Sequence, residues 1–483
     1  ILAADAPKMK MTTSIPQEIT MPDSVQTRLG TLKFFDGLPD KATVKKLYDN
    51  LDFMRGVDVF LNTLAAGSSL AQFRGLRSVG ADNQTVVLLQ NRLDAKSLFL
   101  TANTQTATLW GVLNLKDGPI VVEVPPAVLG LADDAWMNYI VDMGVVGPDK
   151  GQGGKYLFLP PGYKGDVPEG YFVAQSKTYE IGYGLRGFTV KGDTGPAVAA
   201  FKKHFRVYPL AQAANPPETK IIMGSGLYFN TIQPDTYQFY EYINGLIQKE
   251  PNEAADPEIL GLLASIGIVK GKPFAPDERM KRILTEAAAV GSATARAISF
   301  RARDKDFFFY PGSAWFNPWV GGSHEFIQNN VRLLDARTCF MYIAAGISPA
   351  MSVKMVGAGS QYAVAAVDAD DNYLDGSKNY RLHLPPNIPV KTFWSVIPYD
   401  TQTRSVLQTD QRDTALSSEM GTVQTNPDGS VDVYFGPKAP KGKESNWIQT
   451  VPGKGWFTVL RLYGPLEPWF DKTWRPGEIE LIK

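Results

Sequence analysis

Short β-rich runs, separated by turn formers, are the feature of this sequence that most limits what the chain can fold into. Between residues 81 and 192, such runs occupy 85–89, 120–124 and 155–159. Turn signals such as the Pro-Pro-Gly sequence at 160–162 divide them, without helical patterns in between. Strands spaced in this way, without crossover helices, are typical of an antiparallel sandwich. We therefore predict a first β-sandwich over residues 81–192.

A second group of β-rich runs fills the carboxy-terminal part of the chain. Residues 380–384, 392–397 and 430–435 alternate between apolar and polar side chains or run apolar, and the Asp-Gly pair at 428–429 marks a turn. Many short strands with turns between them favour a closed or double-sheet architecture. The sequence predicts a second sandwich, a jelly roll, over residues 346–483.

Helical patterns occupy the two remaining parts. After Asp40, apolar side chains recur every three or four positions, and Gly67 is predicted to end this helix. Asp256 and Pro257 have the capping pattern of a helix start. Further helices are expected from Asp235 as a cap over 236–248, from 276 towards Arg296, and from Ser323 as a cap through Asn330 to Ala345. The predicted fold is mainly β with an α layer (α+β), divided into 1–80, 81–192, 193–345 and 346–483.

Composition excludes several classes of protein. The 483 residues carry 49 basic and 49 acidic side chains, so no positive excess exists to neutralise nucleic-acid phosphates. No run approaches the roughly 20 apolar residues that a membrane-spanning helix needs. The first residues, Ile-Leu-Ala-Ala-Asp-Ala-Pro, are similar to the end of a processed export signal. The lone Cys339 cannot form an internal disulfide, which suits a large periplasmic protein. We expect a periplasmic or secreted protein.

Several sequence motifs together resemble a two-part bacterial family. Phe-Asp-Gly-Leu-Pro at 35–39 and Pro-Pro-Gly-Tyr at 160–163 are similar to domain of unknown function 1254. The stretch 368–376, Thr-Phe-Trp-Ser at 392–395 and Leu-Arg-Leu-Tyr at 460–463 resemble domain of unknown function 1214. The resemblance implies an immunoglobulin-like first sandwich, a helical subdomain and a carboxy-terminal jelly roll. It implies no established activity.

Motifs for cofactors and metals are incomplete. The Gly-Tyr-Gly-Leu-Arg-Gly string at 182–187 is followed by a strand pattern, whereas a dinucleotide site needs a helix there, so we expect no cofactor. Three histidines and one cysteine offer no zinc or iron cluster. Asp368, Asp370 and Asn372 have the spacing of the first calcium-loop ligands, but Tyr373 stands where that loop needs glycine. A hairpin turn is the favoured interpretation of this stretch.

Two function classes remain open, and a third is a protein without a small-molecule site. The first is a binding protein that holds a glycan or another polar organic ligand in an inter-domain cleft or on an aromatic surface. Its support is the set of carboxy-terminal aromatic residues, with Asn446 and Arg461 as orienting groups: Trp394, Trp447, Trp456, Tyr463, Trp469 and Trp474. The second is a carboxylate-dependent hydrolase or lyase, for example with Asp142 and Glu123, or Glu325 and His324. No recognisable catalytic motif supports it.

Ligand sites favour junctions between domains, where concave surfaces arise without hollowing a core. The candidates from the first sandwich fall in or beside turns, and those from the helical part surround an aromatic loop: Asn103, Thr104, Asp142, Tyr163, Arg303, Trp315, Asn317 and His324. Arg303 can bind a carboxylate bidentately, and Trp315 can offer a stacking face. Sandwich edges and a neutral net charge also predict a homo-oligomer, with a dimer as the first expectation.

Overall fold

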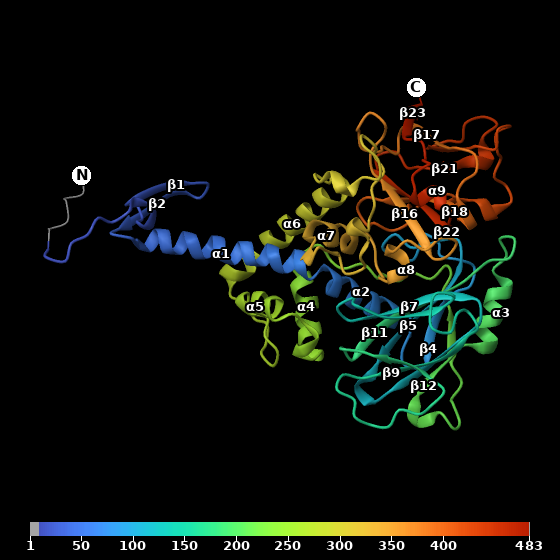
Figure 1. Ribbon diagram of the computed structural model, residues 1–483, viewed down its shortest axis with the longest axis horizontal. Coiled ribbons are helices and arrows are strands. Elements are labelled where there is room, and N and C mark those ends of the chain that lie inside the picture. Colours follow the sequence, from blue (N-terminus) through green and yellow to red (C-terminus); the bar gives the residue numbers. More distant parts are fainter. Residues whose placement is uncertain (1–8, 483) are drawn as a thin grey trace.

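The computed structural model describes residues 9–482 and has two pairs of β-sheets joined by a helical layer, with an arm that projects to one side (Figure 1). The architecture is α+β, with both antiparallel and mixed sheets. No helix in this described part of the chain combines the length and apolar character needed to cross a bilayer.

The first sheet pair contains a six-stranded sheet in the order β13-β4-β5-β11-β7-β8 and a four-stranded sheet in the order β10-β9-β6-β12. Val86, Leu109 and Leu185 of the larger sheet share one core with Val122 and Phe158 of the smaller sheet, so the two sheets pack face to face. The strands are β4 Thr85–Leu89, β5 Ala107–Asn114, β6 Ile120–Val124, β7 Val128–Asp134, β8 Tyr139–Gly144, β9 Gly154–Leu159, β10 Phe172–Gln175, β11 Glu180–Gly187, β12 Arg206–Pro209 and β13 Lys220–Met223.

The second sheet pair consists of two four-stranded sheets, β16-β22-β18-β19 and β21-β20-β17-β23. Val396 and Leu460 from the first of them meet Leu382 and Val433 from the second in a common core. The strands are β16 Ser360–Ala365, β17 Asn379–Leu384, β18 Val390–Asp400, β19 Leu416–Ser417, β20 Val431–Gly436, β21 Trp447–Gln449, β22 Trp456–Pro465 and β23 Ile479–Ile482.

The helical layer lies between the sheet pairs and shares a large core with both of them. Phe340 and Tyr342 of this layer belong to the same buried cluster as Val112 of the first sheet pair and Val364 of the second. The helices of the described chain are α1 Lys41–Asn62, α2 Leu64–Ser78, α3 Gly195–His204, α4 Gln238–Lys249, α5 Pro257–Ser265, α6 Glu278–Phe300, α7 Leu334–Ile343, α8 Pro349–Ser352 and α9 Glu467–Phe470. Of these, α3 packs on β5 and β11 of the first sheet pair and is not part of the layer. Short 3-10 helices occupy Gln17–Ile19, Leu115–Asp117, Leu210–Gln212, Asn252–Ala254, Lys305–Phe307, Val320–Gly322, Ser418–Met420 and Glu444–Asn446.

Local capping determines where several helices begin. The carboxylate of Asp40 accepts the N–H of Thr43 at 2.7 Å at the start of α1, and Asp256 accepts the N–H of Glu258 at 2.8 Å at the start of α5. Asp277 caps α6 in the same way, through the N–H of Met280 at 2.7 Å. Each cap satisfies a backbone donor that has no partner within the helix.

Three local predictions were wrong. Gly67 does not end a helix but lies inside α2, where a Cβ would stand 2.4 Å from the ring of Phe239. Asn329 and Asn330 adopt positive φ and form a turn between β14 (Ile327–Gln328) and β15 (Val331–Arg332), so the helix predicted from Ser323 begins at α7 instead. Asp235 makes no cap for α4, because its carboxylate binds distant side chains instead.

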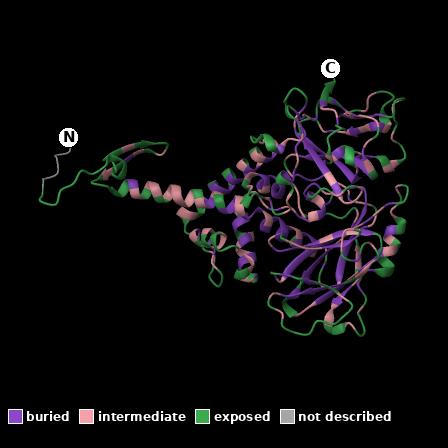
Figure 2. Ribbon diagram, in the orientation of Figure 1, coloured by how far each residue is buried: buried purple, intermediate pink, exposed green. Residues whose placement is uncertain are grey.

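The arm contains a small sheet of three strands, β1 Ser24–Thr27, β2 Gly30–Phe35 and β3 Leu38–Pro39, followed by the first turns of α1. In Figure 2 the arm is mostly exposed or intermediate, whereas the sheets of the body are mostly buried. The second half of α1 packs on α6 and so joins the arm to the helical layer.

Candidate functional site

A cavity of about 70 Å³ lies where the two sheet pairs meet the helical layer. Trp110 of β5 and Arg186 of β11 line it from the first sheet pair, and Tyr362 of β16 and Arg461 of β22 line it from the second. A neighbouring cavity of about 50 Å³ shares several of its walls: Thr108, Trp110, Arg186, Ala345 and Met351. The molecule therefore holds an internal space to which both sheet pairs contribute charged side chains.

Two arginine side chains give this space its positive charge. Arg461 is 4% exposed, and its Nη2 donates to the carbonyl oxygen of Thr101 and, at 2.8 Å, to the hydroxyl of Tyr399. Its Nε is buried without a hydrogen-bond partner. Arg186 lines both cavities. Neither guanidinium has a carboxylate partner among the described residues, although Arg461 is buried and Arg186 half-buried, and charges removed from water are normally paired.

Tyrosine side chains surround the two guanidiniums. The guanidinium of Arg461 lies 5.1 Å from the ring centroid of Tyr362 and 5.9 Å from that of Tyr399. The hydroxyl of Tyr362 is 2.6 Å from the hydroxyl of Ser360. Burial alone would raise the pKa of Tyr362, but the charges of Arg186 and Arg461 outweigh burial and lower that pKa. The hydroxyl of Tyr362 therefore lies in the same positive field that would attract an incoming anion.

Thr101 forms a strained part of the cavity wall. Its φ is 37°, in the left-handed region, which is unfavourable for a β-branched residue. Its N–H donates to the carbonyl of Arg404 at 2.8 Å and its hydroxyl to the carbonyl of Ile343 at 2.9 Å, while its own carbonyl accepts from Arg461. Such strain persists when the surrounding contacts over-determine the conformation.

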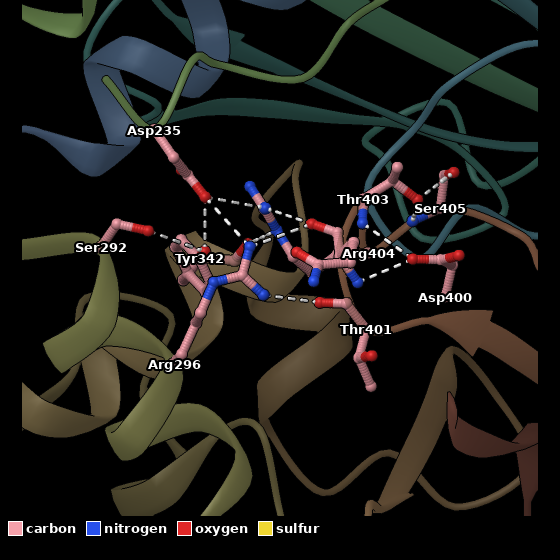
Figure 3. A network of polar contacts seen from close by, with 10 residues as sticks. Asp235, Ser292, Arg296, Tyr342, Asp400, Thr401, Thr403, Arg404 and Ser405 are labelled. Carbon is pink, nitrogen blue, oxygen red and sulfur yellow. Dashed lines mark hydrogen bonds and ion pairs between the residues drawn. The ribbon is translucent and has the colours of Figure 1, made fainter. Parts of the chain in front are cut away.

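A polar network behind this wall fixes it in place (Figure 3). Oδ2 of Asp235 accepts from the hydroxyl of Tyr342 at 2.7 Å, from Nη1 of Arg404 at 3.1 Å and from Nη2 of Arg296 at 3.3 Å. Arg296 also donates to the carbonyl of Thr401 at 2.7 Å. Because Arg404 supplies the carbonyl that holds Thr101, the network connects the helical layer to the cavity wall.

The wall of the second cavity includes a buried carboxyl group, that of Asp142. Asp142 on β8 lines it, is 6% exposed, and has a buried Oδ1 without a hydrogen-bond partner. Burial raises the pKa of Asp142 to about 6, against the opposing effect of the Ser348 and Tyr139 hydroxyls. Close by on β7, Asp133 accepts the N–H of Ile347 at 2.7 Å, and burial raises its pKa well above the usual range. Asp142 can therefore carry or release a proton near neutral pH.

The eight residues predicted for the site do not share one cavity. Asn103 lines the 70 Å³ cavity and Asp142 the adjacent one, while Thr104 is buried nearby and accepts from the amide of Gln105 at 3.0 Å. The other five lie elsewhere. Tyr163 packs on the outer side of the four-stranded sheet, in a loop. Arg303 has an 88% exposed side chain and pairs with Asp335.

Trp315, Asn317 and His324 have structural surroundings. Trp315 is fully buried in the core of the second sheet pair, and its Nε1 donates to the carbonyl of Gly477 at 2.8 Å. Asn317 caps the turn to Trp319. The ring of His324 lies edge-on to Tyr139, 5.5 Å between centroids, and burial lowers its pKa.

Of the two pairs named as candidate acid–base groups, the members of one are separated and the carboxylate of the other is exposed. Glu123 lies on β6 in the four-stranded sheet, where it accepts from the hydroxyl of Tyr208 at 2.7 Å, and Asp142 lies on β8 in the six-stranded sheet. Glu325, next to His324, is exposed. Among residues 9–482, no group of three or more His, Cys, Asp or Glu side chains converges as a metal site.

The stretch considered for calcium uses its carboxylate for a turn. Oδ1 of Asp368 accepts the N–H groups of Asp370 at 3.0 Å and of Asn372 at 2.9 Å. The side chain of Asp370 is exposed beside them. This is the hydrogen bonding of an Asx turn, the local structure that such a sequence forms without an ion.

Sequence reasoning missed Arg186 as a site residue and considered Arg461 only as part of an aromatic surface. The sequence held a signal for both arginines. Each stands within a strand pattern, and the residues directly beside it in the sequence are apolar or glycine. A charged side chain in such a strand needs a partner or a function.

Two regions of the chain match known families. Residues 83–209 match the family described as Protein of unknown function (DUF1254), and residues 359–467 match Protein of unknown function (DUF1214). The chain therefore contains a region that matches DUF1254 followed by a region that matches DUF1214. The resemblance predicted from the sequence motifs is confirmed. Arg186 lies within the matched DUF1254 residues and Arg461 within those of DUF1214, so each family domain supplies one of the two guanidiniums.

One solved structure gives a likeness in fold, and a second match is weaker. The VPA0106 protein from Vibrio parahaemolyticus is 18% identical, with a TM-score of 0.53, and the match covers 89% of this chain and all of that chain. An uncharacterized protein from Burkholderia cenocepacia is 11% identical, with a TM-score of 0.40, and the match covers 90% of this chain and 96% of that one. A comparison with curated proteins finds no match.

Proposed function

We propose that this protein binds a small organic anion, such as a carboxylate, in the cavity between its two sheet pairs. The observation that carries the proposal is the pair of guanidiniums, Arg186 and Arg461, which line one cavity without a carboxylate partner in residues 9–482. Burial of an unpaired charge is unfavourable by several kcal/mol, and a bound anion offsets that cost. Guanidinium groups bind carboxylates through paired, charge-assisted hydrogen bonds.

The size and walls of the cavity narrow the ligand. A single water occupies about 10–15 Å³ on the same scale, so adjacent cavities of 70 and 50 Å³ each admit a molecule of a few non-hydrogen atoms. The rings of Phe99 and Trp110, stacked at 5.4 Å, give one wall an apolar surface. A glycan bound on an open aromatic surface is less favoured, because the second sheet pair buries most of its tryptophans: Trp394, Trp456, Trp469 and Trp474.

The binding experiment uses the full chain and a panel of small mono- and dicarboxylates, with phosphate and sulfate as inorganic anions. At least one carboxylate is expected to raise the melting temperature and to bind by titration calorimetry. Arg186→Met and Arg461→Met are each expected to weaken that binding by roughly tenfold or more, the effect of one lost charge-assisted hydrogen bond. Arg303→Met is the matched control, because Arg303 lies on the surface.

Two outcomes would contradict this proposal. One is a panel in which no anion changes the melting temperature, combined with native mass spectrometry that finds no co-purified small molecule. The other is binding that survives both cavity substitutions as well as it survives Arg303→Met. Either result would favour a protein without a small-molecule site.

A second candidate function is acid–base catalysis on the bound anion, favoured by the buried Asp142 beside Arg186. Asp142, ionised above its pKa of about 6, would take a proton from the carbon next to the ligand carboxylate. The C–H electron pair would move into the carboxylate as an enediolate, which the guanidiniums stabilise, and return of the proton would restore the ligand. Exchange of that hydrogen in deuterated water, followed by NMR, tests this step. Asp142→Asn must abolish the exchange while the ligand still binds.

We also propose the finer folds implied by the family resemblance, an immunoglobulin-like first sheet pair and a jelly-roll second sheet pair. The support for the jelly roll is its two facing sheets of four strands each. An experimental structure compared strand by strand with both architectures tests this assignment.

A further inference from the structure

The arm, defined as residues 9–55, leaves much of its apolar surface uncovered (Figure 1). Phe35 is 80% exposed and Leu38 is 67% exposed. In the described chain, nine of the 25 most exposed large apolar side chains lie on this short segment: Met9, Met11, Ile15, Ile19, Met21, Phe35, Leu38, Tyr48 and Met54. A concentration of exposed apolar residues of this kind marks an interaction surface.

The arm is nevertheless fixed in position. The hydroxyl of Thr43 accepts the N–H of Lys33 at 2.9 Å, which ties β2 to the start of α1. Arg279 of α6 binds Asp49 at 2.6 Å and Asp52 at 2.7 Å, which ties α1 to the body. Within the β1–β2–β3 sheet, Leu32 is the one buried side chain. So small a sheet is marginally stable in water unless one of its faces is covered.

The outer edge of β1 is open for pairing. The carbonyl of Asp23 accepts the N–H of Phe34 at 2.8 Å. Because hydrogen-bonded pairs alternate along an antiparallel ladder, the backbone groups of Val25 point to β2 and those of Ser24 and Gln26 point to the open edge. β1 contains no charged residue and no proline, the side chains with which exposed edges are usually protected.

We infer that β1 pairs antiparallel with β1 of a second copy of the chain, across a two-fold axis at Val25. An antiparallel edge is self-complementary, as a symmetric dimer requires. With the axis at Val25, Ser24 of each copy lies opposite Gln26 of the other, and every outward N–H and C=O of these residues is paired. If the two-fold axis lay at Ser24 instead, Gln26 of one copy would lie opposite Pro22 of the other, and proline has no N–H to donate.

Charge and area agree with a second copy as the occupant. Residues 9–55 contain seven basic and six acidic side chains, so two arms meet without net repulsion. At about 150 Å² for a large side chain, the nine exposed apolar residues present on the order of 800 Å², which is what each partner contributes to a standard interface.

Light scattering on the full chain tests the assembly. The expected mass is twice the 53.0 kDa of one chain. Gln26→Pro removes an outward N–H and places a ring on the open edge, so it is expected to give monomers at the same concentration. Gln26→Thr is the matched control, because it also loses the side-chain bond to Thr31 but keeps the backbone N–H. A monomeric wild type, or a Gln26→Pro variant that remains dimeric, overturns the inference.

A disulfide tests the register. Val25 of the two copies would form a non-hydrogen-bonded pair with Cα atoms about 4.5 Å apart, within the range that a disulfide spans. Val25→Cys is expected to cross-link into a covalent dimer on mild oxidation. Val173→Cys on the edge strand β10 is the control, since Val173 is 50% exposed and so more accessible than the half-buried Val25, and the native Cys339 is buried. Equal cross-linking at both positions, or none at position 25, contradicts pairing through β1.

Discussion

Replacement of Asp142 by asparagine is expected to stabilise the protein at alkaline pH. The carboxyl group is 6% exposed, Oδ1 has no hydrogen-bond partner, and burial raises its pKa from 3.8 to about 6. A group with a raised folded-state pKa contributes its full stability below the unfolded-state value and loses that contribution as the pH rises through the folded-state value. A shift of about two units corresponds to roughly 3 kcal/mol of unfolding free energy, lost in the wild type between pH 4 and pH 7.

Asp142→Asn has no charge to bury, so this loss is absent from the variant. Urea unfolding of both proteins at a series of pH values measures the difference. The variant is expected to gain about 2–3 kcal/mol relative to the wild type at pH 8 and to gain nothing at pH 4. Parallel stability curves for the two proteins would refute the reasoning, because they would mean that the folded-state pKa of Asp142 is ordinary. A substitution that increases stability at a residue is consistent with a functional role of that residue, as proposed for Asp142.

Three further predictions concern other parts of the molecule. Asp235→Ala leaves Arg404 buried without its carboxylate partner and is expected to lower the unfolding free energy by about 3 kcal/mol. Asp371→Ala, the control, removes an exposed partner of Arg301 and should change the unfolding free energy by less than about 1 kcal/mol. Urea unfolding measures both variants, and equal losses would contradict the stabilising role of the network around Asp235. Gly67→Ala forces a Cβ to 2.4 Å from Phe239 and is expected to lower the unfolding free energy by about 1–3 kcal/mol. Gly245→Ala, the control in the open interior of α4, should raise it by about 0.5–1 kcal/mol. Thermal unfolding measures both, and a Gly67→Ala protein as stable as the wild type would show that α2 and α4 move apart easily. Calcium is expected to leave the melting temperature unchanged, because Asp368 is occupied by its turn, and a clear rise would support a calcium site at that turn.

Those parts of the fold that depend on neighbouring residues could be predicted from the sequence. The cap predicted at Asp256 forms, and the helices predicted after Asp40 and from residue 276 also begin at aspartate caps, because a short side chain beside a helix start has an N–H within reach whatever the rest of the chain does. Alternating apolar runs and turns likewise indicated two groups of β-strands. Where a distant partner competes with local structure, the prediction failed, as for Asp235, whose carboxylate binds Arg404 169 residues away instead of capping α4.

The candidate site depends almost entirely on such distant contacts. Arg461 binds Thr101, 360 residues earlier in the chain, and no local pattern indicates that these two residues meet. Of the residues predicted for the junction, Asn103 and Asp142 line the two adjacent cavities, Asn103 from the loop before β5 and Asp142 from within β8. Trp315 was selected for its aromatic face, but a large aromatic side chain in a loop can equally fill a core, and the sequence does not distinguish the two.

The division of the two guanidiniums between the matched family domains has a consequence for how such proteins can evolve. Arg186 comes from one domain and Arg461 from the other, and the carbonyl of Thr101 in the first domain accepts from Arg461 in the second. Neither domain by itself holds both guanidiniums of the proposed site, and each one, separated, would leave a charged side chain facing solvent or unsatisfied. The two domains are therefore expected to be inherited as one unit and to resist recombination with other partners. A ligand bound between the two domains would contact both of them, so that docking of the domains and binding of the ligand would stabilise each other.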